Sequence, residues 1–149
     1  MNIWYESDYD LGELNALCRQ SAIENCGIIV TKIGQDYLEG TMPVDQRTIQ
    51  PFGVLHGGAT ALLAESLGSI AANLCIDHTV FRAIGQSIQT NHLLPAFKDY
   101  VIGIASPLHL GRRSHLWRIE IYLPDRKRII SSSTLTLAIL PQKELTKPK

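Results

Sequence analysis

Residues 56–76 read HGGATALLAESLGSIAANLCI and form the longest apolar run of the chain. The run has the length of a buried helix, which we predict over residues 57–76. Its many Ala and Gly residues and its internal carboxylate distinguish it from a membrane span. A helix that is apolar on nearly every side must be wrapped by other structure rather than laid on a surface, and a curved sheet is the simplest wrapper.

Strand-like segments flank this helix on both sides. Residues 28–33 and 37–44 are predicted to form a hairpin before it. A short helix is expected earlier, beginning at the capping sequence of Asp10 and ending near residue 25. The strands predicted after the long helix span residues 81–91, 100–108, 115–123 and 129–140. This order predicts an α+β fold in which a curved antiparallel sheet wraps one long central helix, the architecture called the hotdog fold.

Length and composition restrict the classes of function. With 149 residues, the chain is expected to be one domain, residues 1–149. The 14 basic and 14 acidic residues balance, so no overall field favours nucleic acid or a membrane surface. The first residues lack the basic start and apolar core of a signal peptide, so a cytoplasmic location is expected. Cys18, Cys26 and Cys75 are irregularly spaced, which predicts free thiols, no disulfide framework and no metal site.

A single carboxylate is the first candidate catalytic group. Glu65 is the only charged residue between His56 and Asp77. Ionised side chains are rarely left in apolar elements, because desolvation disfavours the charged form. A carboxylate placed there is therefore a candidate site residue. The alternative is that Glu65 reaches solvent or pairs with a distant arginine.

The start of the same helix is the second candidate. Its first amide N–H groups lack intrahelical partners and lie at the positive end of the helix dipole, so they can hold an oxyanion. Glycine at positions 57 and 58 lets a carbonyl group approach the backbone closely. The alternative is that His-Gly-Gly is only a tight helix start.

These two candidates cannot serve one substrate from the same chain. Glu65 is eight positions beyond Gly57, which is about 12 Å along a helix axis, whereas attack and hydrogen-bond distances are about 3 Å. Antiparallel packing of two such helices would bring Gly57 of one chain opposite Glu65 of another. The sequence therefore predicts that activity requires a homodimer, or a homotetramer made of two dimers.

At this point the residues resemble a known family, the bacterial hotdog-fold acyl-CoA thioesterases. The likeness is greatest to the branch that hydrolyses 1,4-dihydroxy-2-naphthoyl-CoA, with phenylacetate-pathway thioesterases more distant. It covers nearly the whole chain. It is carried by QPFGVLHGG at 50–58, AESLGS at 64–69, NH at 91–92 and LHLGR at 108–112.

The resemblance implies a role for several residues. Glu65 would be the nucleophile or general base, Gly57 the oxyanion donor and Gln50 a polar contact near the thioester. Ser69 would orient Glu65 or the water, and His56 would brace the loop. Residues expected at the substrate or at coenzyme A are Gly58, Ser66, His92, Arg112, Arg113 and Ser114.

One position departs from the family pattern. The segment after Asn91 and His92 often carries a basic residue that meets coenzyme A phosphate, but position 94 here is leucine. His92 and the Arg112–Ser114 group are the expected substitutes, since a local group of donors suits phosphate. A solvated turn is the alternative for Arg113. The change at Leu94 leaves open a different nucleotide pose, an acyl carrier protein donor, or weaker binding.

The expected function is hydrolysis of an aromatic or medium-chain acyl-CoA. Thiolates leave readily, since thiol pKa values are about 8.5, so neither a strong acid, a metal nor a redox cofactor is needed; coenzyme A enters only as part of the substrate. A dehydratase or hydratase using His56 and Glu65 on a 3-hydroxyacyl thioester is a second hypothesis, although the proline-rich glycine loop of such enzymes is missing. A non-catalytic acyl-CoA binding protein is a third. The sequence leaves the acyl group undetermined.

Overall fold

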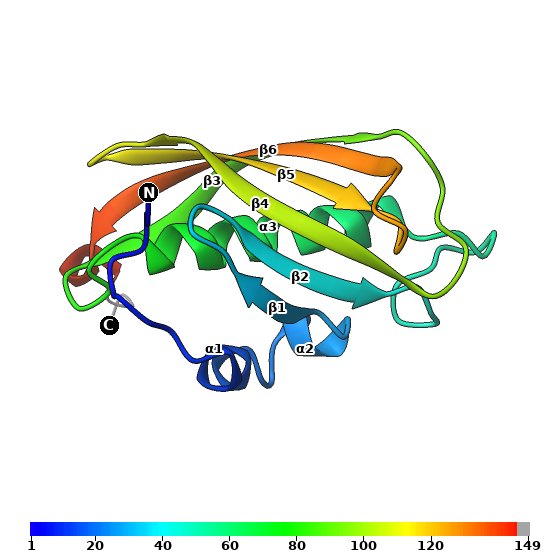
Figure 1. The fold of residues 1–149 in the computed structure, drawn as a ribbon, viewed down its shortest axis with the longest axis horizontal. Helices are drawn as coiled ribbons and strands as arrows, with labels where there is room; N and C mark the ends of the chain where they lie inside the picture. The colour runs from blue at the N-terminus through cyan, green and yellow to red at the C-terminus, as the bar shows by residue number, and fades with distance from the viewer. Residues whose placement is uncertain (146–149) are drawn as a thin grey trace.

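The computed structural model describes residues 1–145 and consists of one long helix held in a curved sheet (Figure 1). The long helix is α3 (Gly57–Leu74), and two short helices precede it, α1 (Leu11–Leu17) and α2 (Ala22–Asn25). The remaining elements are β1 (Ile29–Ile33), β2 (Leu38–Pro43), β3 (Phe81–His92), β4 (Tyr100–Leu110), β5 (Ser114–Tyr122), β6 (Ile129–Pro141) and the 3-10 helix η1 (Gln142–Leu145). This is the α+β arrangement predicted from the sequence.

All six strands belong to one antiparallel sheet with the order β1-β2-β4-β5-β6-β3. Strand β3 follows α3 in the chain and joins the far side of the sheet, where β6 is its one partner among the strands of residues 1–145. The sheet therefore has two edge strands, the short β1 and the long β3, and each is bonded at one residue by an asparagine side chain, Asn15 at Val30 and Asn73 at Ala83. None of the helices within residues 1–145 is long and apolar enough to cross a membrane.

Close contact between α3 and the sheet requires glycine on two of the strands that face the helix. Leu63 and Leu67 are fully buried. A side chain built at Gly103 on β4 would place its Cβ 2.6 Å from Leu67, and one at Gly40 on β2 would place it 2.7 Å away. Glycine at both positions lets the sheet close over the leucine, which contributes about 1.5–3 kcal/mol of hydrophobic stabilisation when fully buried.

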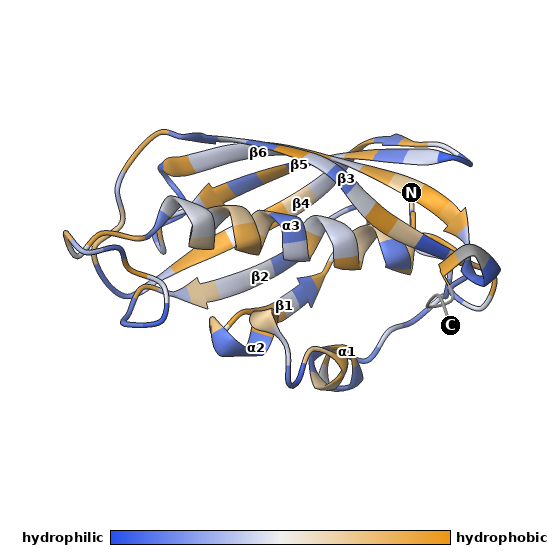
Figure 2. Cartoon of the chain, turned by 180° about the vertical axis from the view of Figure 1, so that it is seen from behind, coloured by the Kyte–Doolittle hydropathy of each residue, from blue (hydrophilic) through white to orange (hydrophobic). Residues whose placement is uncertain are grey.

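The small residues of α3 are divided between its two faces. Gly68 and Ala72 are buried, and a Cβ at Gly68 would lie 2.6 Å from Leu135 of β6. Gly58, Ala61 and Ser69 keep some exposure on the side away from the sheet. Figure 2 shows α3 lying over the sheet with this side uncovered. Only the second group therefore remains available to a neighbouring molecule.

The predicted N-terminal helix is two helices rather than one. Asp10 caps α1 by accepting from the amide of Glu13, as the capping sequence predicts. The chain then turns at Gln20, whose φ is +56°, and Ser21 caps α2 through the amide of Ile23. A residue in the left-handed region ends an α-helix. The apolar pattern of the sequence does not report backbone φ, and so it did not show this break.

An ion pair ties the β5–β6 turn to strand β2. Arg126 donates to both carboxylate oxygens of Glu39, at 2.7 and 2.9 Å, and Glu39 is buried. The guanidinium of Arg126 holds the pKa of Glu39 below its ordinary value. We expect Arg126→Met to lower the free energy of unfolding by about 1–3 kcal/mol, because it leaves a buried carboxylate without its partner. The neighbouring Arg128→Met should have little effect, since its ion pair with Asp125 is exposed.

The pH dependence of this pair has a definite sign. A lowered pKa in the folded state stabilises the protein above the ordinary carboxyl pKa of about 4.3, and this stabilisation is lost as the pH falls through the folded-state pKa. The difference in thermal stability between the wild type and Arg126→Met should therefore be largest near neutral pH and narrow in acid. A difference that stays constant down to about pH 3 would contradict this role for Glu39.

Candidate active site

The start of α3 leaves the amide of Gly57 free for a ligand. The His56 side chain caps the helix by accepting from the Gly58 amide through Nδ1 at 2.8 Å. The His56 amide donates to the carbonyl of Thr48, and the Thr60 amide donates to the carbonyl of His56. Within residues 1–145, no acceptor contacts the amide of Gly57. Of the two glycines, Gly57 is thus the one that can donate to a ligand, whereas the Gly58 amide is already engaged.

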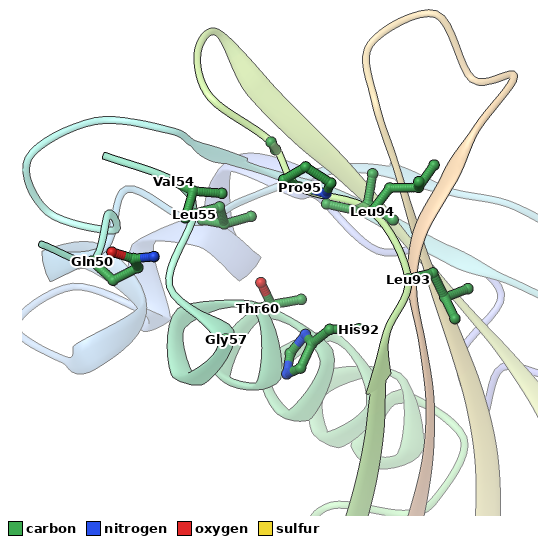
Figure 3. Close-up of a pocket in the computed structure, with 11 residues that line it drawn as sticks. Gln50, Val54, Leu55, Gly57, Thr60, His92, Leu93, Leu94 and Pro95 are labelled. Atoms are coloured by element: carbon green, nitrogen blue, oxygen red, sulfur yellow. The ribbon is translucent and has the colours of Figure 1, made fainter. Parts of the chain in front are cut away.

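A pocket of about 370 Å³ opens in front of this amide (Figure 3). Most of its wall is apolar and comes from the loops on either side of the helix start, while Gln50, Thr60 and His92 add polar groups. The lining residues are Gln50, Val54, Leu55, Gly57, Thr60, His92, Leu93, Leu94, Pro95, Ala96 and Ile130. An apolar pocket with a few convergent donors is the usual form of a small-molecule site.

Gln50 presents its amide nitrogen to this pocket. Its side-chain oxygen accepts from the amide of Phe52 in the loop before α3. That contact fixes the orientation of the side chain, and Figure 3 shows the nitrogen directed toward the space shared with Thr60 and His92. The loop thus supplies a second donor close to the helix start.

His92 lies directly against Gly57. A Cβ built at Gly57 would fall 2.9 Å from His92 Nε2, closer than real Cβ contacts occur. Any larger residue at position 57 would therefore displace the imidazole beside the free amide. His92 thus belongs to the helix-start pocket together with Leu94, the position where the family pattern has a basic residue.

Glu65 does not line this pocket, in agreement with the helical spacing. It is half-buried on the outer side of α3, and Ser69 one turn later donates its hydroxyl to Glu65 Oε1 at 3.4 Å. Its carboxylate also lies against the backbone of β3 at Gly85. The alternative in which Glu65 pairs with an arginine has no support, because no such ion pair forms within residues 1–145.

The phosphate-binding candidates fall into two separate places. Arg112, Arg113 and Ser114 form the β4–β5 turn, where with His109 and Gly111 they line a second pocket of about 590 Å³. Figures 1 and 2 both place this turn at the end of the molecule where α3 ends, whereas His92 lies where α3 begins. Within one chain they do not form the single group of donors that the sequence suggested.

Ser66 does not face either pocket. It is buried, and its hydroxyl donates to the carbonyl of Leu62 in the preceding turn at 2.6 Å. Within the chain Ser66 thus lies apart from the helix-start pocket, and the substrate contact expected for it stays a prediction. Thr60, by contrast, was missed by sequence reasoning although it lines the pocket. Its only sequence signal was its position one turn beyond the His-Gly-Gly start.

The cysteine nearest to α3 is a poor nucleophile. Burial raises the pKa of the Cys75 thiol to about 12, so the thiol stays protonated at neutral pH. The thiolate is the reactive form of cysteine, and burial of this kind makes a thiol inert. Burial also lowers the pKa of His115, with a smaller contribution from His109, which keeps this interior imidazole neutral. Neither residue reaches the helix-start pocket.

Known proteins resemble this chain in sequence. The family model described as the thioesterase superfamily matches residues 52–130. A 1,4-dihydroxy-2-naphthoyl-CoA hydrolase of Escherichia coli is 46% identical over 130 residues, which cover 87% of this chain and 94% of that protein.

The chain belongs to the thioesterase superfamily.

Solved structures agree with this assignment and confirm the hotdog fold. A thioesterase of Haemophilus influenzae matches this thioesterase with a TM-score of 0.92 and 39% identity, over 97% of this chain and 99% of that one. A Staphylococcus aureus thioesterase matches with a TM-score of 0.76 and 31% identity, over 80% and 98% of the two chains. It has been crystallised with a glutamine, and separately with a glutamate, replaced by alanine. Those two positions are fifteen residues apart, as are Gln50 and Glu65 in this thioesterase.

Proposed function

We propose that this thioesterase hydrolyses an aromatic or medium-chain acyl-CoA at the start of α3, with a carboxylate supplied by a second copy of the chain. The observation that carries the proposal is the free Gly57 amide at the head of the apolar pocket. The name of the Escherichia coli relative makes 1,4-dihydroxy-2-naphthoyl-CoA the first substrate to test.

The helix start polarises the thioester. A thioester carbonyl placed in the pocket would accept from the Gly57 amide, at the positive end of the helix dipole, with the Gln50 amide as a second donor. Both donors stabilise the negative charge that develops on the oxygen during attack. The departing group is a thiolate, which needs no strong general acid because thiol pKa values are about 8.5. No metal or redox cofactor takes part in these steps.

Glu65 of the partner subunit would complete the site, acting as nucleophile or as the base that activates water. Three features support the arrangement. Glu65 and Ser69 lie on the uncovered side of α3, β3 is a long edge strand beside them, and Glu65 is absent from the pocket of its own chain. Antiparallel packing of two chains would create two equivalent sites, so the active species is a homodimer or a homotetramer.

The same packing would bring the two groups of phosphate-binding candidates together. The β4–β5 turn lies at the end of α3, so in an antiparallel pair it approaches the helix start of the other chain. Arg112, Arg113 and Ser114 of one chain would then meet the nucleotide of a substrate bound beside Gly57 and His92 of its partner. Guanidinium groups bind phosphate bidentately, which suits this role.

A double substitution tests that placement. We expect Arg112→Ala with Arg113→Ala to raise KM for an acyl-CoA about tenfold with little change in kcat, because contacts to a remote phosphate are equally strong in the ground and transition states. The KM for a thioester of the same acyl group with N-acetylcysteamine, which lacks the nucleotide, should not change. Arg128→Ala is the matched control on the next turn. An equal rise in KM with both thioesters would contradict phosphate binding by these arginines.

Turnover of a substrate panel tests the function itself. Aromatic and straight-chain acyl-CoA thioesters are assayed for thiol release, with an acyl carrier protein thioester of the same acids as the alternative donor. A 3-hydroxyacyl-CoA is followed by absorbance for dehydration. We expect thiol release and no dehydration, because the His56 ring that a dehydratase would use already caps the helix. Binding without thiol release from any thioester would instead indicate a non-catalytic acyl-CoA binding protein.

A further inference from the structure

Strand β3 makes an unusually close approach to the Glu65 carboxylate. A Cβ built on Gly85 would lie 2.2 Å from Glu65 Oε1 and 3.3 Å from its Cδ. The carboxylate therefore occupies the volume that the first side-chain atom of any other residue at position 85 would need.

The backbone itself does not require glycine at this position. Gly27 and Gly53 adopt positive φ, which side chains disfavour, but Gly85 does not. Glycine is otherwise a poor residue within a strand, and there it often marks a site of close approach. The nearest atoms to the missing Cβ all belong to Glu65. The demand for glycine thus comes from the carboxylate and not from the conformation of β3.

The strand is also bent at this point. Gly85 pairs with Leu137 and Ser87 with Thr136, so the intervening Gln86 is an extra residue in the ladder with β6. Bulges of this kind bend a strand and are frequent beside active sites. On its other side the carboxylate receives the hydroxyl of Ser69. The Glu65 carboxylate is thus held between the Ser69 hydroxyl on α3 and Gly85, beside the bulge on β3.

We propose that Gly85 is a positioning residue, whose missing side chain sets the place of the Glu65 carboxylate. The inference rests on the catalytic role proposed above for Glu65. The atom that a new methyl group would strike is the end of a flexible side chain, so an alanine at position 85 would move the carboxylate and leave the backbone in place. A reacting group displaced by about 1 Å can lose about a hundredfold in rate.

The experiment compares two glycines at which an added Cβ would lie equally close to a neighbouring side chain. In Gly85→Ala the new Cβ meets Glu65 Oε1 at 2.2 Å, and in Gly34→Ala it meets the ring of Tyr37 at 2.2 Å, in the β1–β2 turn. We expect Gly85→Ala to lower kcat for acyl-CoA hydrolysis about a hundredfold while KM, Tm and oligomeric state stay as in the wild type. Gly34→Ala should keep the wild-type kcat. A wild-type kcat in Gly85→Ala would overturn the proposal.

A second background separates positioning from a structural effect. Glu65→Asp withdraws the carboxylate by one methylene group. Gly85→Ala should therefore lower kcat by a smaller factor in the Glu65→Asp chain than in the wild type. If Gly85→Ala lowers kcat by the same factor in both chains, Gly85 does not act through Glu65. If Gly85→Ala lowers Tm or dissociates the oligomer in the Glu65→Ala chain, where no carboxylate is struck, the role of Gly85 is structural. Full activity of Glu65→Ala would instead refute the proposed function, whatever Gly85→Ala shows.

Discussion

Glu65→Ala is expected to lower kcat for acyl-CoA hydrolysis about a thousandfold, since a positioned base or nucleophile contributes that order of acceleration. The oxyanion donors remain, so slow turnover above the uncatalysed rate should persist. Stability and oligomeric state should change little, because the side chain is half-buried and its hydrogen bond, to Ser69, is long at 3.4 Å. Thiol release and size-exclusion chromatography measure the two outcomes.

Asp77→Ala is a suitable control for the removal of a carboxylate. It lies just beyond the same helix, bonded to Thr79 and Tyr5, and away from the pocket. It should keep the wild-type kcat. Unchanged turnover by Glu65→Ala would remove Glu65 from the mechanism.

The second large effect is expected from mixed subunits. Gly57→Val should be inactive alone, because its side chain would meet His92 and occupy the pocket space beside the proposed oxyanion donor. A heterodimer of a Glu65→Ala chain with a Gly57→Val chain has one site in which both residues are intact, if each site draws Gly57 and Glu65 from different chains. Two proteins with little or no turnover of their own should therefore give a heterodimer with about half of the wild-type turnover.

The control carries the same two substitutions in one chain. We call it the shared arrangement when each site takes Gly57 from one chain and Glu65 from the other. Under that arrangement a wild-type chain paired with a Glu65→Ala, Gly57→Val chain has no intact site. If each chain works alone, the wild-type chain keeps one. The shared arrangement thus predicts activity in the first heterodimer and none in the second, and the opposite result would show that each chain holds a complete site. Two different affinity tags allow both heterodimers to be isolated from co-expressed chains.

The elements were predictable because their sequence patterns are local. The long helix was expected over residues 57–76 and spans Gly57–Leu74, and every predicted strand is present to within two residues. Strand order was not predictable, since nothing within residues 81–92 indicates that β3 crosses to pair with β6. Pairing partners depend on contacts between distant segments, which local periodicity does not encode.

The candidate site was predicted only in part for a related reason. The Gly57 amide and the separation from Glu65 follow from helix geometry and agree with the structure. Ser66 was expected at the substrate from the family resemblance, and a helix that is apolar on all sides gives no periodic signal to show that this side chain is buried. The contact between Glu65 and Gly85 joins two elements across the fold, and no spacing rule reveals it.

The edge strand β3, which lies next to β6, affects how this protein must be handled. Strand β3 has 12 residues and a neighbouring strand along one margin, and Ile84 on it is exposed. Its other margin carries the outward backbone groups of alternate residues, of which those of Ala83 are bonded to the Asn73 side chain. Such a margin is a template for uncontrolled strand addition and aggregation. Substitutions that separate the subunits should therefore yield precipitate rather than well-behaved single chains. The proposed requirement for a partner is better examined by recombining chains than by attempting to isolate one.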